Sequence, residues 1–455
     1  MEPHSLIRRL KFRHTFLFAF IVANLNVALA QRVEPVPHSA GDTLSSATLE
    51  QVVAYAITHQ PLVKQAEADE SIANSVIKGK LADWLPQINF SANYQRYFDL
   101  QSSVIGGNVV RFGVDNTSSV QITGTQSIFN RDALLASTTA SKVRIQAQQN
   151  TEKSKIDVVV GVTKAFYDLL ATEQQISVNQ ESIVRLQRSL KDARSRYDAG
   201  IADKTDYKRA QIQLANTQVS LQTAQELLKY KKEYLKMLMG YPVDRHFDIQ
   251  YDTAVMEQDV PLDTTQELVY TNNIDYRLLY MQKELQEANV KYANWAYLPS
   301  LNLFGAYILN YQNDAIGELY HNRYPFSYAG ATLAFPIFQG GKRIAKVREQ
   351  RWTSRRIEWG LANLRNSINA EYNRALATYK SNLANYYVQK ENVDLAREVY
   401  DVIQLQYSSG IRPYLDVTVA ETDLRTTRIN YFNALYAVLA SKMDVLRALG
   451  QINYE

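Results

Sequence analysis

The sequence predicts a mainly α protein with a membrane β part, built from a helix–strand–strand–helix unit that occurs twice. Three observations predict this fold class. Residues recur at an offset of about 210 positions, hydrophobic residues repeat every seven positions over long stretches, and four short segments alternate apolar with polar residues. Of the 455 residues, 46% are hydrophobic and 21% are charged, so the chain has enough apolar surface to fold and is not a disordered protein.

Composition also limits the chemistry of this chain. The formal net charge is +4, and residues 1–30 contribute a surplus of three, so the remainder is nearly neutral and shows no electrostatic bias towards nucleic acid. The absence of cysteine excludes disulfides, thiolate metal sites, cysteine nucleophiles and a lipid on an N-terminal cysteine. The six histidines are scattered, and no HExxH, phosphate-binding glycine loop or nucleophile elbow occurs. The sequence therefore predicts neither an enzyme nor a bound cofactor or metal.

Residues 1–30 are predicted to be a signal peptide. A basic stretch over 8–14 precedes a mostly apolar run over 15–30, which ends in Ala-Leu-Ala, and cleavage is expected before Gln31. An uncleaved anchor is the alternative, but the run is short and contains two asparagines. Residues 31–46 follow as a linker. No later apolar stretch approaches the ~18 residues of a transmembrane helix, so a membrane crossing would need β-strands.

Residues 47–240 and 264–455 are predicted to be two copies of one unit. The matching pairs include Gly200 with Gly410, Asp206 with Asp416, Leu85-Pro86 with Leu298-Pro299, and Ile128-Phe129 with Ile337-Phe338. The offsets of 210, 213 and 209 differ only slightly, which places the length differences in loops. Residues 241–263 join the two units. We expect this segment to lie in an equatorial belt around the helices, and the sequence assigns it no function.

Each unit is predicted to contain two long helices. They lie over about 130–197 and 206–239, and over about 340–407 and 414–449. In the first of these helices the residues that step by seven are Val162, Leu169, Ile176, Ile183, Leu190 and Tyr197. A strict seven-residue repeat predicts helices wound around one another with a left-handed twist. Gly200 and Gly410 are predicted to end the longest helices. The second unit has mostly tyrosine at the equivalent positions, and we expect these rings to pack in a core or interface, with an aromatic binding ladder as the alternative.

Four segments are predicted to be strands. They lie over about 87–97, 118–128, 300–311 and 326–337, with long polar loops over 99–117 and 312–325. Alternation over about ten residues is typical of membrane β-barrel strands. Four strands cannot close a barrel, and each unpaired backbone group in lipid costs several kcal/mol. Copies of the chain must therefore share their strands, and three copies would give twelve. The sequence thus predicts a homotrimer.

These features resemble the TolC family of outer-membrane efflux proteins, also called outer membrane factors. The motifs are LEQVVAYAITHQP (49–61), DWLPQINFSANY (83–94), PIFQGGKR (336–343), RYDAGIADKTDY (196–207) and QYSSGIRPYLDV (406–417). The resemblance covers residues 47–450. It implies a long coiled-coil α-helical barrel across the periplasm, plus a 12-stranded β-barrel shared by a trimer, with four strands per chain, in the outer-membrane lipid of a Gram-negative bacterium.

The resemblance also implies a function and partners. It implies a passive exit channel of a tripartite efflux or type I secretion system, opened by a periplasmic adaptor (membrane fusion) protein and an inner-membrane pump. Drug efflux, metal efflux and protein secretion are alternative tasks for such a channel. A secreted coiled-coil scaffold without a pore is the alternative from another class of protein, and a soluble scaffold would hide or lack the outward apolar strand faces.

A gate at the periplasmic helix ends is a further implication of the resemblance. The implied gate residues are Asp416, Asp206, Thr205, Arg412 and Tyr407, next to the helix-end turns at Gly200 and Gly410. Thr205 and Asp206 would face Arg412 and Tyr407, and Arg412 can form a charge-assisted hydrogen bond with Asp206. Asp416 would line the aperture, and because the second acidic position of the family falls at Val419, a single acidic ring is expected. The alternative is that both aspartates only stabilise first helical turns.

Overall fold

The computed structural model describes residues 46–454, which belong to one structural unit. The predicted signal peptide and nearly all of the predicted linker lie outside these residues. The elements are, in chain order, β1 (Ser46–Ala47), α2 (Leu49–His59), α3 (Pro61–Leu81), η1 (Ala82–Trp84), β2 (Gln87–Arg96), β3 (Gln101–Ile105), β4 (Asn108–Phe112), β5 (Asn116–Phe129), α4 (Arg131–Asp198), α5 (Lys204–Met239), β6 (Asp248–Ile249), α6 (Thr253–Gln258), η2 (Tyr270–Asn272), α7 (Ile274–Trp295), β7 (Ser300–Asn313), η3 (Ile316–Glu318), β8 (Tyr324–Ala334), α8 (Lys342–Ser408) and α9 (Tyr414–Leu449).

Two sets of elements match in order and in length. The series α3, β2, β5, α4, α5 corresponds to α7, β7, β8, α8, α9, with helices of 21, 68 and 36 residues in the first set and 22, 67 and 36 in the second. At 1.5 Å per residue, α4 and α8 each extend for roughly 100 Å. The prediction of a mainly α fold with long helices and a β part is confirmed. None of the helices within residues 46–454 is both long enough and apolar enough to cross a membrane.

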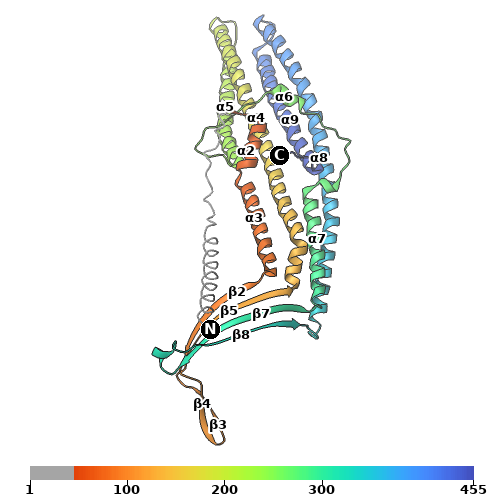
Figure 1. Cartoon of the computed structure of the whole chain (residues 1–455). Helices are drawn as coiled ribbons and strands as arrows, with labels where there is room; N and C mark the ends of the chain where they lie inside the picture. Colours follow the sequence, from red (N-terminus) through yellow and green to blue (C-terminus); the bar gives the residue numbers. More distant parts are fainter. Residues whose placement is uncertain (1–45, 455) are drawn as a thin grey trace, which may run out of the picture. The chain divides into compact units, whose positions relative to one another are not determined.

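Two shorter helices pack along each of the long helices: α3 and α5 along α4, and α7 and α9 along α8 (Figure 1). Near the sheet the helices are neighbours in the order α3, α4, α7, α8, and towards the far helix ends in the order α5, α4, α9, α8. The small residues Ala210, Thr217 and Ala224 of α5 are buried, which allows close approach to α4. In both layers α8 is the last helix at one edge, while α3 or α5 is the last helix at the other.

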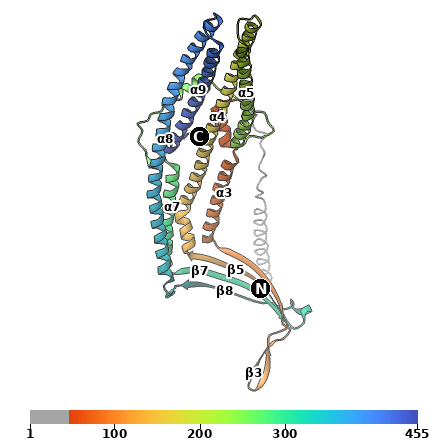
Figure 2. The same cartoon turned by 180° about the vertical axis from the view of Figure 1, so that it is seen from behind.

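Four strands form one antiparallel sheet in the order β2, β5, β7, β8 (Figure 2). Residues opposite one another across this register share a face. One face exposes the apolar side chains of Ile88, Phe90, Ile122, Leu303, Tyr307 and Leu333. The other face carries Asn89, Ser91, Gln121, Thr123, Ser127 and Asn302, with Phe304, Phe326 and Tyr328 on β7 and β8. The sheet therefore has an apolar face and a mainly polar face, and β2 and β8 are its open edges.

The connection between β2 and β5 differs from the prediction. The sequence predicted a polar loop over 99–117, whereas the structure has the hairpin of β3 and β4 there, closed by the two-residue turn Gly106-Gly107. Both glycines have positive φ, and such a turn matches the twist of the flanking strands. The polar serines and glutamine of this segment obscured its short runs of valine and isoleucine, and therefore its strands were missed.

The segment that joins the two units is held by tyrosine hydroxyls of α8. Tyr379 donates a hydrogen bond of 2.8 Å to the carbonyl of Val260 in this segment, and Tyr372 donates one of 2.8 Å to the carbonyl of Gln266, just after the segment. The same segment also contains β6, which pairs in parallel with β1. The tyrosine rings are buried, as predicted for core packing. Their hydroxyls add a role that leucine could not perform, because they bond the backbone of the segment that crosses them.

Gly450, at the end of α9, is expected to be the least replaceable glycine of the fold. Its φ is +71°, and a Cβ atom there would lie 2.3 Å from the carbonyl oxygen of Asn272. We therefore expect Gly450→Ala to lower the free energy of unfolding by more than about 2 kcal/mol, because left-handed strain and a backbone clash add. Thermal unfolding followed by circular dichroism measures the effect. Gly200→Ala is the matched control, since its φ is +74° but no atom lies within 4 Å; equal losses in both variants would contradict the clash.

Candidate gate at the helix-end turns

Two equivalent turns lie at the ends of α4 and α8 that are farthest from the sheet (Figure 1). In each turn a glycine in the left-handed conformation follows the helix, and two backbone hydrogen bonds close it. These bonds run from Gly200 to Tyr197 and from Ile201 to Arg196, and from Gly410 to Tyr407 and from Ile411 to Gln406. Glycine and the residue after it thus satisfy the last carbonyls of each helix. The turns position the first residues of α5 and α9 beside the ends of α4 and α8.

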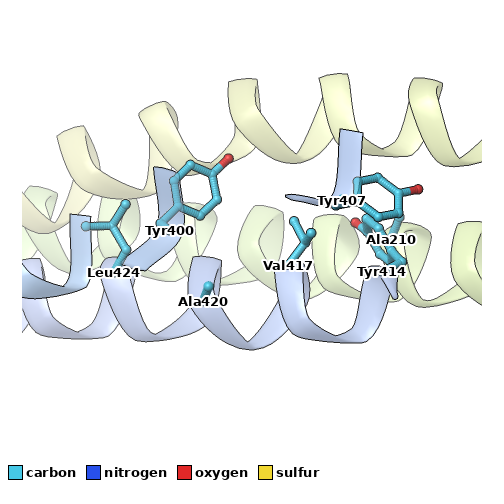
Figure 3. Packing of buried hydrophobic residues seen from close by; sticks show 7 residues of the cluster. All are labelled: Ala210, Tyr400, Tyr407, Tyr414, Val417, Ala420 and Leu424. Atoms are coloured by element: carbon cyan, nitrogen blue, oxygen red, sulfur yellow. The ribbon is translucent and has the colours of Figure 1, made fainter. Parts of the chain in front are cut away.

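Tyr407 lies between the two turns and is almost buried, with 5% of its surface exposed. Its ring meets that of Tyr414 edge-on, with centroids 5.4 Å apart, in a cluster that includes Ala210 of α5 and Val417 of α9 (Figure 3). The guanidinium of Arg196 lies 4.8 Å from the ring centroid of Tyr407. Burial raises the pKa of the Tyr407 hydroxyl, which the charge of Arg196 opposes, so this tyrosine stays protonated at neutral pH.

Arg196 also joins the two turns directly. Its Nη2 donates a hydrogen bond of 2.8 Å to the carbonyl of Ser408, the last residue of α8. The side chain therefore contacts both the ring of Tyr407 and the backbone beyond it. The sequence analysis did not identify Arg196 as a gate residue, although Arg196 is the first residue of the motif over 196–207 that contains the turn at Gly200.

Within the single chain, Arg412 bonds residues of its own turn. Its Nη1 donates to Asp416 Oδ2 over 3.1 Å, and its Nε donates to Gln406 Oε1 over 3.3 Å. The bond from Arg412 to Asp206 stays a prediction, since in the single chain the guanidinium of Arg412 bonds Asp416 instead. The physical reason is the spacing of Arg412 and Asp416, because residues four apart at a helix start lie on the same side. Within one chain, Arg412 thus partly neutralises the carboxylate that was expected to line the aperture.

Asp206 and Thr205 lie in the first turn of α5. The backbone N–H of Thr205 donates to Asp203 Oδ1 over 2.7 Å, which makes Asp203 the capping residue of α5 and lowers the pKa of its carboxyl. Partial burial, together with the negative charge of Asp203, raises the pKa of Asp206. Asp206 also lies close enough to Tyr407 to raise the pKa of its hydroxyl. In the single chain, Asp206 therefore lies near Tyr407.

A buried carboxylate links the two helical hairpins, about two turns into α9 and about four turns before the end of α4. Glu421 of α9 is 2% exposed, and it accepts hydrogen bonds from Ser182 Oγ at 2.6 Å and from Arg185 Nε and Nη2 at 3.0 and 3.2 Å. A second link joins Arg428 of α9 to Glu181 of α4, and the bond from Arg428 lowers the pKa of Glu181. Sequence reasoning missed both links, because a glutamate beside a small-residue seam resembles an ordinary solvated position.

The described residues offer no evident metal site. Among residues 46–454, no group of three or more histidine, aspartate or glutamate side chains could hold a metal ion together. What these helices provide instead is a set of polar links. Arg196 of α4 bonds Ser408 of α8, and Arg412 joins Gln406 of α8 to Asp416 of α9. Farther from the turns, the buried pair of Arg185 and Glu421 joins α4 to α9. Such links can hold helix ends together and can be broken by a binding partner.

Comparison with known proteins agrees with this architecture. The chain matches the outer membrane efflux protein family over residues 52–241 and 272–451, which are the two units on either side of the joining segment. The chain belongs to the outer membrane efflux protein family. Among curated proteins, it is 22% identical to the outer membrane protein TolC of Escherichia coli (strain K12), covering 91% of this chain and 85% of that protein.

Solved structures of outer-membrane channels share the fold of this efflux protein. CusC superposes with a TM-score of 0.73 at 15% identity, covering 92% of this chain and 97% of CusC. The CmeC outer membrane channel of Campylobacter jejuni superposes with a TM-score of 0.71 at 16% identity, covering 91% of this chain and 90% of CmeC. Family and fold are those of transport channels rather than of enzymes, and the family resides in the outer membrane.

Proposed function

We propose that three copies of this efflux protein form a passive conduit across the periplasm and the outer membrane. The conduit serves as the exit channel of a tripartite efflux or type I secretion system and is opened by a periplasmic adaptor and an inner-membrane pump. The observation that carries the proposal is the pair of open sheet edges. Within residues 46–454, β2 and β8 each have one neighbour only, and one face of the sheet exposes large apolar side chains. An apolar sheet in lipid requires every backbone group to be paired.

The helices at the edges support the same assembly. On α5, one stripe of exposed apolar side chains runs along the side opposite to the buried seam of Ala210 and Ala224, and it consists of Ile212, Val219, Tyr230 and Met237. On α8, Val388, Leu395, Val402 and Leu405 are exposed in the same half of the helix layer. Stripes of this kind on the outermost helices are typical of surfaces that pack against another copy. Edge-to-edge packing of α5 against α8 of the next copy would extend the layer into a closed wall.

The helix-end turns are proposed to form the gate of this conduit. With threefold symmetry, one Asp416 per chain gives a ring of three carboxylates, and a single ring is proposed because the neighbouring turn position is Val419. Carboxylates about 8 Å apart would repel by about 2 kcal/mol per pair at an effective dielectric constant of about 20. Such a ring attracts cations, and Arg412 moderates it through its hydrogen bond to Asp416. Tyr407, Asp206 and Thr205 complete the gate at the base of the turns.

Asp416→Ala is expected to weaken the block of single-channel current by Mg²⁺ by roughly tenfold, because the carboxylates that concentrate the cation are lost. Arg412→Ala is expected to do the opposite: it frees Asp416, strengthens the block and raises conductance. Both effects are measured in planar bilayers. Asp198→Ala is the matched control, since Asp198 is an exposed carboxylate near the equivalent turn between α4 and α5. An unchanged block in Asp416→Ala would remove the ring.

The conduit itself is tested on the purified full chain. We expect trimers by analytical ultracentrifugation in detergent, recovery from the outer-membrane fraction, and stepwise conductance after insertion into a planar bilayer. Protein that remains monomeric, or trimers that never conduct ions, would overturn the proposal. A soluble periplasmic rod would instead favour the alternative of a coiled-coil scaffold.

A further inference from the structure

A cavity of about 1050 Å³ lies where the helices meet the sheet. Its walls come from the first turns of α4 and α8, the last turns of α7, the end of β8 and the start of β7. On the strands, the lining includes Ser300, Asn302 and Ala334, which lie on the mainly polar face of the sheet. The cavity is about 100 Å of helix away from the helix-end turns, and it takes no part in the gate described above.

The lining of this cavity is strongly cationic. Four basic side chains contribute to it, Arg131 of α4 and Lys342, Arg343 and Lys346 of α8, whereas Asp132 is the acidic residue among the lining positions. The Asp132 carboxylate is engaged, because it accepts a hydrogen bond from the hydroxyl of Tyr292. Lys346 pairs with Glu349 at 2.7 Å. The remaining three cations form no ion pair with any residue between 46 and 454.

The two arginines among these three cations are positioned by aromatic rings and carbonyls rather than by carboxylates. The guanidinium of Arg131 lies 4.8 Å from the ring centroid of Tyr292, and that of Arg343 lies 4.7 Å from the ring centroid of Tyr297. Arg343 also donates a hydrogen bond of 3.1 Å to the carbonyl of Ile337. Ring faces and carbonyls orient a guanidinium without removing its net positive charge. These contacts therefore leave a positive potential directed at the cavity.

The same cavity offers apolar surface beside the charge. Tyr292 and Trp295 of α7 and Phe335, just after β8, contribute to its lining, and Phe335 is exposed. A concave site with aromatic walls and a few convergent cations suits a small organic molecule that carries both an aromatic or alkyl part and an anionic group. Inorganic anions would gain only the electrostatic part of this interaction.

We propose that this cavity is a transit site for amphipathic organic anions, whose sulfonate, phosphate or carboxylate group contacts Arg131 and Lys342 while the apolar part packs on Trp295 and Phe335. The inference rests on the proposed function in one respect, because the polar face of the sheet lines a passage only when copies close into a conduit. A lipid headgroup would reach the cavity from the apolar face of the sheet, whereas three of the four lining strand residues, Ser300, Asn302 and Ala334, lie on the polar face; the fourth is Phe129, at the end of β5. A solute moving through the passage is therefore the occupant that the geometry favours.

The test uses naphthalene-1,5-disulfonate as the probe, because this rigid aromatic dianion does not partition into lipid. The full chain is placed in nanodiscs of phosphatidylcholine, and binding is measured by isothermal titration calorimetry. We expect saturable binding that Arg131→Gln with Lys342→Gln weakens by about tenfold, as when charge-assisted hydrogen bonds to an anion are lost. The control is Arg348→Gln with Arg351→Gln, which removes the same charge from exposed positions of α8 outside the cavity. The control is expected to bind within twofold of the unaltered protein.

Further outcomes distinguish a free organic anion from a lipid headgroup as the occupant of the cavity. They also distinguish failure of the transit site from failure of the conduit. Equal weakening in both double variants would indicate bulk attraction only and would overturn the site. Loss of probe binding when phosphatidylglycerol replaces a third of the lipid would assign the cavity to a lipid headgroup and would overturn a transit site. In planar bilayers, the disulfonate should reduce single-channel current in the unaltered protein and in the control. Channels that conduct without binding the probe contradict only this inference, whereas probe binding by protein that never conducts contradicts only the conduit.

Discussion

Ile212→Glu combined with Val219→Glu is expected to abolish assembly of the trimer and, with it, all channel activity. Both side chains lie on the exposed apolar stripe of α5, with 62% and 63% of their surface accessible in the single chain. Burial of one such side chain contributes about 1.5–3 kcal/mol, and burial of an unpaired carboxylate costs several kcal/mol more. The loss of association free energy occurs at each of the three equivalent interfaces of the trimer. We therefore expect a monomer in detergent at micromolar concentration.

The measurement is the oligomeric state by analytical ultracentrifugation, followed by insertion into a planar bilayer. The matched control is Gln218→Glu with Gln225→Glu, which adds the same charge to exposed polar positions on another side of α5. This control should remain trimeric and conduct. Trimers with normal conductance in the Ile212 and Val219 variant would show that the stripe faces water, and the packing of α5 against α8 of a second copy would then have to be abandoned.

Glu421→Ala is expected to be the most destabilising single change in the helical part of the protein. It leaves Arg185, which is 22% exposed, without its carboxylate and deprives Ser182 of its acceptor. Removal of one partner from a buried ion pair costs about 3–5 kcal/mol, because the other charge remains uncompensated. The loss should appear as a lower midpoint of thermal unfolding, with the helix ends becoming accessible to protease before the rest of the chain.

The double variant Glu421→Leu with Arg185→Met distinguishes the effect of an uncompensated charge on Arg185 from the effect of lost side-chain packing. We expect it to recover most of the stability, because well-packed apolar side chains often replace a buried ion pair without loss. Glu398→Ala, at an exposed position of α8, is the control and should change stability by less than about 0.5 kcal/mol. A Glu421→Ala protein that unfolds at the same temperature as the control variant would mean that the buried bond contributes nothing to the joint between α4 and α9.

Most of the regular structure could be predicted because its signals are local. The seven-residue repeat that includes Val162 and Tyr197 predicted the coiled helix now seen as α4, and the alternation around Phe90 predicted the strand seen as β2. The hairpin of β3 and β4 was missed because short strands in a polar segment give almost no periodic signal. The joining segment was expected to form a belt, but the bonds from Tyr379 to the carbonyl of Val260 and from Tyr372 to that of Gln266, just after the segment, could not be predicted from spacing.

The candidate gate shows the same limit. Spacing places Asp206 and Asp416 in first helical turns, and the sequence alone suffices for that. It did not reveal that Arg412 bonds Asp416 within the chain, or that Arg196 joins both turns. The local sequence shows which polar residues lie near a turn. Which of them form hydrogen bonds with one another depends on the directions of their side chains, and these are set by the packing of two helices.

The sequence by itself determined the duplicated unit, the long helices and the alternating strands, because the periodic spacing of apolar residues along the chain indicates which side of each element is buried. Tertiary structure decided which polar groups meet. Glu421 lies 236 residues from Arg185, and Lys342 lines the same cavity as Arg131 although 211 positions separate them. Such contacts follow from the way whole helices and strands pack. The free energy of each contact depends on its burial, and this burial is created by segments that are distant in the sequence.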